Sequence, residues 1–228
     1  MFRFVREAFR DIRNTGSVWP SSPALAKAMT RGLGELTGRR RVLEVGPGTG
    51  PFTERILRHL RDGDHFDVVE LNAAFCRELD RRLLAPHRRR HPGVSVALHE
   101  APIEQAPIEG PYDLIVCGLP FNNFPPALVR SIFRRMMALL REGGELAYFE
   151  YAGVRTFKAP LVGAQGRRRL RGIAKVGQSL RRKHEGSKEL VLGNLPPAVA
   201  VHLRKNSEKA AASSKSGRKA ARRVRGRD

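Results

Sequence analysis

The residues best suited to chemistry lie in a glycine-rich run, Glu44-Val45-Gly46-Pro47-Gly48-Thr49-Gly50, which follows an apolar stretch. Glycines at this spacing let the backbone turn sharply and approach a ligand without a Cβ in the way, as at the nucleotide-binding edge of α/β sheets. A dinucleotide fingerprint needs its third glycine three residues after the second, whereas Gly50 follows Gly48 by two. The run therefore predicts a cofactor site and disfavours a dinucleotide as its ligand.

The same run resembles motif I of the class I S-adenosylmethionine-dependent methyltransferases, in which an acidic residue stands two positions before G-x-G-x-G. This resemblance implies S-adenosylmethionine as the cofactor, bound by Glu44, Gly46, Gly48 and Gly50.

A second candidate carboxylate ends the next apolar run. Glu70 follows Gly46 by 24 residues, near the roughly 20-residue spacing of a ribose-binding acid. One carboxylate can accept hydrogen bonds from both ribose hydroxyls. We predict that Glu70, with Leu71 beside it, binds the ribose; the alternative is a solvated acid at a strand end.

The second motif is Gly118-Leu119-Pro120-Phe121, after the fourth expected strand. Ligands of doubly wound sheets lie at this edge, and we predict that Gly118 contributes to the cofactor site and faces the transferred methyl. In nucleic-acid amine methyltransferases, to which the segment is similar, an Asn, Asp or Ser at the first position accepts from the target amine and the aromatic stacks on the base. Gly118 offers only its backbone carbonyl, which suits a flexible alkyl amine better than the planar amine of adenine. Alternatively, Phe121 is a core side chain.

The elements that must position these motifs alternate between strand-like and helix-like patterns. We expect strands at 42–46, 65–71, 94–99, 112–118 and 145–151, helices at 52–61, 73–84 and 126–141, and a closing hairpin of 189–192 and 198–202. Gly143-Gly144 is interpreted as the stop of the last of these helices. The pattern predicts an α/β, Rossmann-like fold with a mostly parallel seven-stranded sheet and an antiparallel C-terminal hairpin.

The first residues predict an amphipathic helix. Its apolar stripe and its arginines fill neighbouring sectors, as in a helix at an anionic lipid interface. The stripe consists of Phe2, Val5, Phe9 and Ile12, and the arginines are Arg3, Arg6, Arg10 and Arg13. The alternative is an arm packed on its own domain. We divide the chain into a membrane-binding helix at 1–13, a catalytic domain at 14–204 and a disordered basic tail at 205–228.

The composition of the chain limits the number of domains, the metal sites and the cellular location that we expect. The chain has 228 residues, 41% of them hydrophobic, which favours one substantial core. Cys76 and Cys117 form no C-x-x-C pair and the histidines have no ligand spacing, so we predict two buried thiols in a reducing compartment and no metal site. No secretory segment or run of about 18 apolar residues is present, which predicts a cytoplasmic protein.

The net charge of +21 favours a polyanionic surface, either a membrane or RNA. Besides the N-terminal arginines and the tail, basic residues gather between Arg167 and Lys188, around an apolar stripe that includes Leu170, Ile173 and Leu180. This stretch fits a lipid interface, or equally a solvated basic helix face over the core.

A more specific resemblance lies between Thr15 and Ala26, where the chain reads T-G-x-V-x-P-S-S-x-x-L-A. Together with the two motifs above and the turn Asn194-Leu195-Pro196-Pro197, this segment resembles the bacterial phospholipid N-methyltransferases over about residues 2–205. The resemblance implies stepwise methylation of the amine of phosphatidylethanolamine towards phosphatidylcholine. We also expect a monomer that binds an anionic membrane surface, at the inner face of the cytoplasmic membrane.

The resemblance extends to the end of the fifth strand. Tyr151 matches the tyrosine of the family's F-T-Y-G motif and is a candidate to orient the amine or the headgroup phosphate, and Glu150 is a candidate proton acceptor. Either residue alternatively only fixes the strand end. Two departures stand out: Ala152 intervenes before Gly153, and Glu100-Ala101 replaces the Gly-Asp pair that holds the adenine amine. Glu100 or a backbone group must then substitute.

Two other functions remain open. Adenine dimethylation of ribosomal RNA fits the charge and the glycine run, but Gly118 and the lack of a further helical domain after residue 205 disfavour it, so nucleic acid is the less favoured partner. A non-catalytic lipid- or RNA-binding protein is disfavoured by the intact Glu44 and Glu70.

Overall fold

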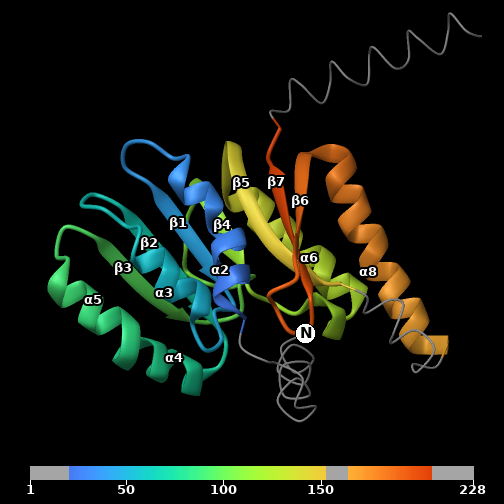
Figure 1. Ribbon diagram of the computed structural model, residues 1–228, viewed down its shortest axis with the longest axis horizontal. Coiled ribbons are helices and arrows are strands. Elements are labelled where there is room, and N and C mark those ends of the chain that lie inside the picture. The colour runs from blue at the N-terminus through green and yellow to red at the C-terminus, as the bar shows by residue number, and fades with distance from the viewer. Residues whose placement is uncertain (1–20, 153–163, 207–228) are drawn as a thin grey trace, which may run out of the picture.

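The computed structural model describes residues 21–152 and 164–206. Its centre is a seven-stranded sheet with the order β3-β2-β1-β4-β5-β7-β6 (Figure 1). The strands are β1 Arg41–Val45, β2 His65–Glu70, β3 Ser95–Glu100, β4 Tyr112–Cys117, β5 Leu140–Tyr151, β6 Glu185–Val191 and β7 Ala198–Arg204. Strands β1 to β5 pair in parallel, whereas β7 pairs antiparallel with β5 and β6. The predicted fold class is confirmed.

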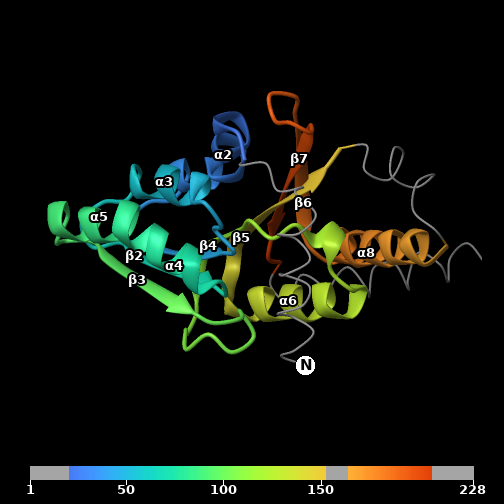
Figure 2. The ribbon, with the colours of Figure 1, turned by 90° about the horizontal axis from the view of Figure 1, so that it is seen from below.

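Helices cover both faces of the sheet. They are α2 Pro23–Met29, α3 Pro51–Leu57, α4 Ala73–Leu79, α5 Ala85–Arg90, α6 Pro126–Leu139 and α8 Ala164–Lys183, with short turns η1 Arg31–Gly34, η2 Asp80–Leu84 and η3 Phe121–Asn123. Helices α2 and α3 lie on one side of the sheet and α6 and α8 on the other (Figure 2). Alternate residues of each strand divide between the two cores: Val42 packs towards α2 and α3, and Leu43 towards α6.

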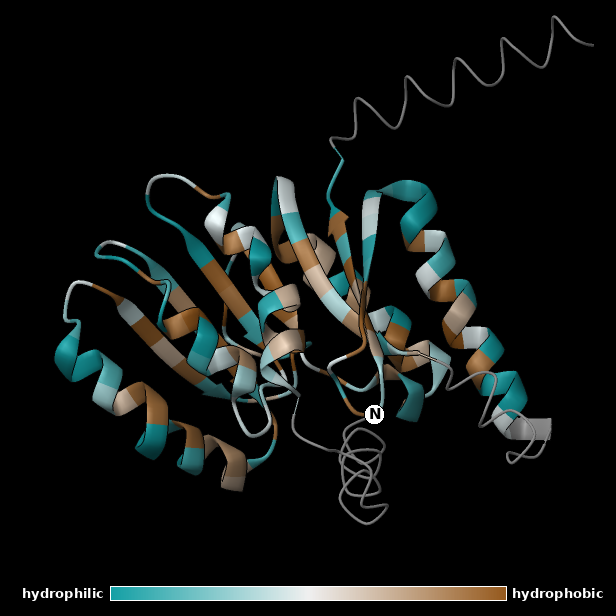
Figure 3. Cartoon of the chain, viewed as in Figure 1, coloured by the Kyte–Doolittle hydropathy of each residue, from teal (hydrophilic) through white to brown (hydrophobic). Residues whose placement is uncertain are grey.

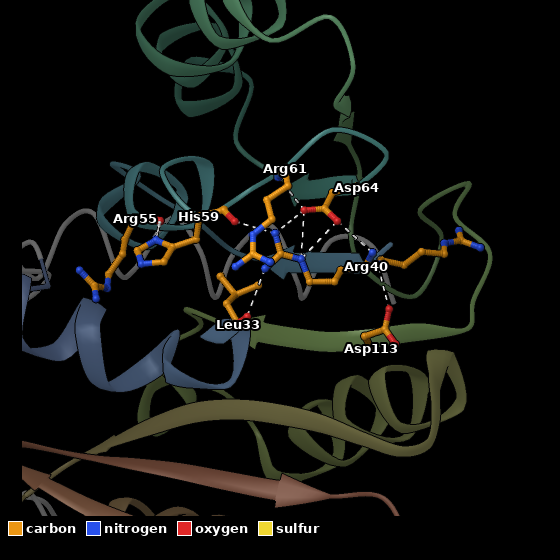
Figure 4. Close-up of polar contacts among 8 residues, drawn as sticks. Leu33, Arg40, Arg55, His59, Arg61, Asp64 and Asp113 are labelled. Carbon is orange, nitrogen blue, oxygen red and sulfur yellow. Dashed lines mark hydrogen bonds and ion pairs between the residues drawn. The ribbon is translucent and has the colours of Figure 1, made fainter. Parts of the chain in front are cut away.

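The start of β1 is fixed by a buried ion pair (Figure 4). The side chains of Arg40 and Asp64 are each 1% exposed and are joined through Arg40 Nε and Nη2. The guanidinium also donates to the carbonyl oxygens of Leu33 at 3.1 Å and His59 at 2.6 Å, so its donors are matched by acceptors from three segments. Asp64 accepts from the backbone N–H of Arg61 at 2.8 Å. Although burial alone raises the pKa of Asp64, these hydrogen bonds outweigh it and the pKa is lowered.

Strand β5 begins five residues earlier than predicted. Helix α6 ends at Leu139, and Gly143-Gly144 lies inside the strand instead of stopping the helix. Gly143 has a φ of +70°, and its N–H donates to the carbonyl oxygen of Lys205. The N–H of Lys205 in turn donates to the carbonyl oxygen of Gly144. The glycines therefore form an irregular start of β5, where the pairing with β4 also shifts register.

Other boundaries also differ from prediction. The helix expected at 52–61 ends at Leu57, and the helix expected at 73–84 continues through α4, η2 and α5 to Arg90. Strand β6 starts at Glu185 instead of 189, because it pairs with β7 along its whole length. Lys205, expected in the tail, is held against the domain: its Nζ donates to the carbonyl oxygens of Met137 at 2.8 Å and Leu140 at 2.6 Å.

The apolar stripe of α8 is buried against the domain. Ile173 and Leu180 pack on the core around α6, and Val176 is 7% exposed, whereas Arg168 and Arg171 are exposed. The alternating bands of α8 are visible in Figure 3. The interpretation as a basic face over the core therefore describes this helix, whose leucine and isoleucine side chains are partly buried against the domain.

The predicted membrane-binding residues 1–13 and most of the tail lie outside the described residues. Within the described residues, no helix combines the length and apolar character that a membrane span requires. Over the same ranges, no three His, Cys, Asp or Glu side chains are grouped so as to hold a metal ion. Cys76 and Cys117 are buried and unbonded, as predicted.

Candidate cofactor and acceptor site

The glycine run forms a tight turn between β1 and α3. Gly46, Gly48 and Gly50 have φ values of +69°, +58° and +87°, a region that favours glycine. A Cβ on Gly46 would lie 2.2 Å from Leu119 Cδ2, and one on Gly50 would lie 2.7 Å from Leu79 Cδ2. Both glycines are therefore required by conformation and by the close approach of neighbouring elements. A Cβ on Gly48, by contrast, would have no heavy atom of another segment within 4 Å, so the turn is open to a ligand there.

Glu44 lies beneath this turn and is fully buried. Its Oε2 accepts from the hydroxyl of Thr53 at 2.7 Å, and its Oε1 has no hydrogen-bond partner among the described residues. Burial, to which the nearby carboxylate of Glu70 adds, raises the pKa of Glu44 to about 8 despite the Thr53 hydrogen bond. The group is thus mainly protonated at neutral pH in the ligand-free protein. Thr53, on the first turn of α3, was not singled out from the sequence.

Glu70 joins the glycine turn to the start of α4. Its Oε2 accepts from the N–H of Gly48 at 3.2 Å and its Oε1 from the N–H of Asn72 at 2.8 Å. Asn72 in turn caps α4, because its Oδ1 accepts from the N–H of Ala74 at 2.9 Å. Glu70 is 3% exposed, and burial raises its pKa against the lowering effect of these N–H donors. The alternative of a solvated acid at a strand end does not describe it.

A pocket opens beside Glu70 at the carboxyl ends of β1, β2 and β4. It is lined by Val45, Gly46, Val69, Glu70, Leu71, Ala101, Pro102, Ile103, Glu104, Leu119 and Ile132. The structure thus brings together the predicted cofactor residues Gly46, Glu70, Leu71 and Ala101. The N–H of Ala101 is bonded to the carbonyl oxygen of Glu70 at 3.0 Å, which fixes the loop after β3 against the second strand.

Glu100 is not among the lining residues of this pocket; it is exposed at the end of β3. Glu104 lines the pocket instead, and its Oε1 is buried without a hydrogen-bond partner within the described residues. A buried acceptor that faces a cavity without a donor is suited to a ligand amine. Nothing in the local sequence distinguishes Glu104 from other loop acids, which is why only the fold reveals it.

Gly118 stands at the closest approach of the two motif loops. A Cβ on Gly118 would lie 2.5 Å from the carbonyl oxygen of Gly46. The N–H of Gly118 donates to the carbonyl oxygen of Val45 at 2.8 Å. An Asn, Asp or Ser side chain at this position therefore has no room unless the backbone moves.

The residues after Gly118 separate this pocket from a second one. Leu119 lines the cofactor pocket, whereas Pro120 and Phe121 line the second. Two consecutive residues of α6 continue the same wall, since Ile132 faces the cofactor pocket and Phe133 the other. Neighbouring residues of the same segments therefore line different pockets, so that the two pockets adjoin each other.

The second pocket is the candidate acceptor groove. It is lined by Pro120, Phe121, Asn122, Phe133, Tyr148, Phe149, Glu150, Tyr151, Leu170, Ile173, Ala174 and Gly177. Phe121 is 5% exposed and packs on Phe133 with ring centroids 4.6 Å apart, so it is a core residue as well as a groove residue. Tyr148 lies edge-on to Phe133 at 5.0 Å. Aromatic and aliphatic side chains thus form most of the groove.

The polar side chains of Asn122 and Glu150 interrupt this lining, and Glu150 has polar neighbours. Glu150 Oε1 lies 3.5 Å from Arg181 Nη1 and 3.5 Å from the hydroxyl of Tyr148, and Arg181 Nη1 donates to that hydroxyl at 3.2 Å. Burial raises the pKa of Tyr148, and the Glu150 carboxylate adds to this effect. Sequence reasoning singled out Glu150 but not Tyr148 or Arg181. The two-residue spacing of Tyr148 and Glu150 puts them on one strand face, whereas Arg181 reaches them from α8.

Tyr151 lines the same groove at the end of β5. Its ring packs edge-on against Phe149 with centroids 5.2 Å apart, and burial raises its pKa. The structure thus brings Phe121, Glu150 and Tyr151 to one groove, with Gly118 beyond its wall.

These residues fit S-adenosylmethionine. The glycine turn leaves open space at Gly48, Glu70 stands at the pocket wall, and the unpartnered Oε1 of Glu104 provides an acceptor for an amine group. A sheet with this strand order, a glycine turn after β1, an acid ending β2 and a facing loop after β4 defines the class I S-adenosylmethionine-dependent methyltransferases.

Comparisons with known proteins agree with this class. A family model described as a methyltransferase domain matches residues 43–146. An ornithine lipid N-methyltransferase of Singulisphaera acidiphila is 31% identical over 150 residues, which cover 63% of this chain and 73% of that protein. The chain belongs to the S-adenosylmethionine-dependent methyltransferase family.

Other similarities are less complete. A ribosomal RNA small subunit methyltransferase A of a Synechococcus species is 33% identical over 121 residues, which cover 51% of this chain and 39% of that protein. Among solved structures, an O-methyltransferase of Bacillus cereus in complex with SAH has a TM-score of 0.57 at 16% identity, covering 89% of this chain and 91% of that one. A Klebsiella pneumoniae protein described as a putative O-methyltransferase has a TM-score of 0.60 at 15% identity, covering 90% of each chain. These structures are similar in fold.

Proposed function

We propose that this methyltransferase acts on the amine of a phospholipid headgroup, that of phosphatidylethanolamine and its mono- and dimethyl derivatives, towards phosphatidylcholine. S-adenosylmethionine supplies an electrophilic methyl group on a sulfonium. The protein's own contribution is then to bind both partners, hold the amine in line and exclude water.

The observation that carries this proposal is the contact between Gly118 and Gly46. Since a Cβ on Gly118 would lie 2.5 Å from the Gly46 carbonyl oxygen, this site has no room for the side-chain acceptor of the adenine amine methyltransferases. A primary alkyl amine can use a backbone carbonyl, because its donors rotate freely. The closed position at Gly118 therefore favours an alkyl amine over a planar one.

The acceptor groove supports the same conclusion. Its lining is aromatic and aliphatic apart from Asn122 and Glu150, and Arg181 reaches Glu150 and the Tyr148 hydroxyl from α8. A lipid presents apolar chains next to one charged headgroup, and this groove offers the matching surfaces. Glu150 is suited to hold the headgroup ammonium and take its proton, while Tyr151, which lines the groove, and Arg181, which contacts Glu150, are suited to orient the phosphate.

The ornithine lipid N-methyltransferase relative adds independent support, because its name describes methyl transfer to the amine of a lipid. Its acceptor differs from phosphatidylethanolamine, so ornithine lipid belongs in any test of specificity.

The rival function is adenine methylation of ribosomal RNA. The similarity to ribosomal RNA small subunit methyltransferases and the net charge of +21 favour it. The Gly118 contact and the apolar groove oppose it.

The experiment that tests the proposal follows labelled methyl from S-adenosylmethionine into three acceptors in parallel. These are anionic vesicles with phosphatidylethanolamine, the same vesicles with ornithine lipid, and unmodified ribosomal RNA. Label in phosphatidylethanolamine supports the proposal, label in ornithine lipid alone moves it to another lipid amine, and label in RNA alone overturns it. Gly46→Ala is the inactive control, because its Cβ would meet Leu119 at 2.2 Å.

We further propose that the enzyme works on the membrane surface at the inner face of the cytoplasmic membrane, held there by residues 1–13. Deletion of these residues is expected to abolish turnover on vesicles while cofactor affinity is retained. Unchanged vesicle binding and turnover after the deletion would refute this anchor.

A further inference from the structure

The β6–β7 hairpin carries exposed leucines. Leu190, Leu192 and Leu195 are 58%, 72% and 66% exposed, and they are the large hydrophobic side chains that the described residues leave open to solvent. The turn from Leu192 to Pro197 contains no charged residue. Single exposed leucines need no explanation, but three within six residues form an apolar tip.

Hydrogen bonds on its buried side join this tip to the rest of the domain. Asn194, between the exposed leucines, is 3% exposed. Its Oδ1 accepts from the N–H of Ser22 at 2.9 Å, and its Nδ2 donates to the carbonyl oxygen of Pro196 at 2.8 Å. The N–H of Ala152 donates to the carbonyl oxygen of Pro197 at 2.7 Å. The turn is therefore fixed to the domain on both sides, with its leucines directed outward.

The tip adjoins the acceptor groove. The first residue of β7, Ala198, pairs with Tyr151, which lines the groove. Leu190 pairs with Val199, and Val199 pairs with Glu150, so these three side chains lie next to each other on one face of the sheet. A surface that covers the tip would therefore also cover the mouth of the groove.

Positive charge lies at the same edge of the molecule. Helix α8 starts at the same lower end of the sheet as the β6–β7 turn in Figure 1, although Figure 2 shows the two apart from each other across this end, and its first turns carry exposed Arg168, Arg169 and Arg171. The helix contains no acidic residue. An apolar tip and arginines at one end of the molecule match the interface of an anionic bilayer, in which acyl chains lie below phosphates over a wide plane. A nucleic acid would use the arginines and leave the leucines in water.

We propose that Leu192 and Leu195 insert into the interface of an anionic bilayer and so set the acceptor groove against the lipid surface. This inference rests on the proposed function, but it concerns docking and not transfer. The two can be tested separately, because docking is measurable on vesicles that contain no acceptor.

The first test measures vesicle binding of the double variant Leu192→Ser/Leu195→Ser. With phosphatidylcholine–phosphatidylglycerol vesicles, binding is expected to weaken about tenfold or more, since two leucines lose apolar contact. Turnover on a water-soluble short-chain phosphatidylethanolamine should be unchanged, because both side chains are exposed and outside the groove. Unchanged vesicle binding overturns the proposal, whatever lipid is methylated. Loss of turnover on the soluble acceptor would also overturn it, because the leucines would then act within the protein.

The second test places an environment-sensitive fluorophore on Leu195→Cys. The native thiols of Cys76 and Cys117 are 4% and 0% exposed, so labelling is confined to the new cysteine. Vesicles should shift the emission to the blue, whereas Glu142→Cys, exposed near the opposite end of β5, should show no shift. Blue emission already in buffer would overturn the proposal in favour of cover by another segment of this chain. Emission that depends on protein concentration without vesicles would overturn it in favour of a second copy.

Discussion

Gly118 and Gly46 are in contact through their backbones, so that a Cβ on Gly118 would lie 2.5 Å from the carbonyl oxygen of Gly46. The two glycines come from different motifs, one after β1 and one after β4. Their contact closes the position at which the adenine methyltransferases place an amide or carboxyl side chain. It therefore links the shape of the cofactor turn to the choice of acceptor.

Gly118→Ala should disturb this contact. We expect a loss of about 1–3 kcal/mol, divided between the free energy of unfolding and cofactor affinity, because backbone atoms must move apart. Thermal unfolding and calorimetric titration with S-adenosylmethionine measure the two parts. Gly34→Ala is the matched control, since no heavy atom lies within 4 Å of its Cβ. Equal behaviour of the two variants would show that Gly118 is not sterically required.

Glu104 is expected to contribute to cofactor binding and Glu100 is not. Glu104 faces the pocket with an unpartnered Oε1, whereas Glu100 is exposed. Glu104→Gln should lose a charge-assisted hydrogen bond of about 1.5–3 kcal/mol, which weakens S-adenosylmethionine binding about tenfold or more. Glu100→Gln serves as the control and should bind normally. The reverse ranking of the two dissociation constants would restore Glu100 as the adenine contact.

The raised pKa of Glu44 leads us to expect that the free energy of unfolding depends on pH. Its pKa is raised by burial to about 8, so the folded protein holds a proton that the unfolded chain releases near pH 4.5. The free energy of unfolding should therefore fall by up to about 1.4 kcal/mol per pH unit as pH rises through this window, and level off above the folded pKa. Denaturant titrations between pH 5 and pH 9 test this. Glu44→Gln should reduce that slope, and the part that remains includes Glu70, whose pKa burial also raises. An identical slope in the variant would assign it wholly to other groups.

Cofactor affinity should follow the opposite trend. A cationic ligand beside Glu44 favours the ionised carboxylate, so the affinity for S-adenosylmethionine should rise with pH up to about 8. Comparison with Glu44→Gln separates this effect from titration of the ligand itself. The same pH profile in both proteins would place Glu44 outside the reach of the cofactor's charge.

The Arg40–Asp64 pair is expected to dominate the stability of the amino edge of the sheet. Both side chains are 1% exposed, and Asp64→Ala leaves the Arg40 guanidinium buried without its counter-ion. We expect a loss of about 3–5 kcal/mol in the free energy of unfolding. Glu54→Ala breaks the exposed pair with Arg58 and should cost less than about 1 kcal/mol. Similar losses in the two variants would contradict this account.

The sequence predicted the parallel half of the fold because its signals are local. Alternating apolar runs, the glycines after β1 and the spacing to Glu70 each reflect one βα unit. Gly143-Gly144 misled for the same reason, since a glycine pair after a helix resembles a stop. Only the pairing of this segment with Lys205, far along the chain, makes it a strand.

The cofactor residues were predictable to the extent that they lie in motifs. Gly46, Glu70 and Ala101 meet in one pocket, as the order of the strands requires. Glu104 and Arg181 have no such signal: Glu104 lies in an irregular loop, and Arg181, which is 31 residues after Glu150 in the sequence, reaches it from α8. Their positions depend on tertiary packing, which residue spacing does not encode.

The account's central claim is that the acceptor is a phospholipid amine. The most direct test expresses the protein in a bacterium that makes phosphatidylethanolamine but no methylated derivatives, and resolves its lipids by mass spectrometry. We predict phosphatidylethanolamine species that carry one, two or three added methyl groups, absent from cells with the Gly46→Ala variant. An unchanged lipid profile, together with new dimethyladenine in the ribosomal RNA, would contradict the claim.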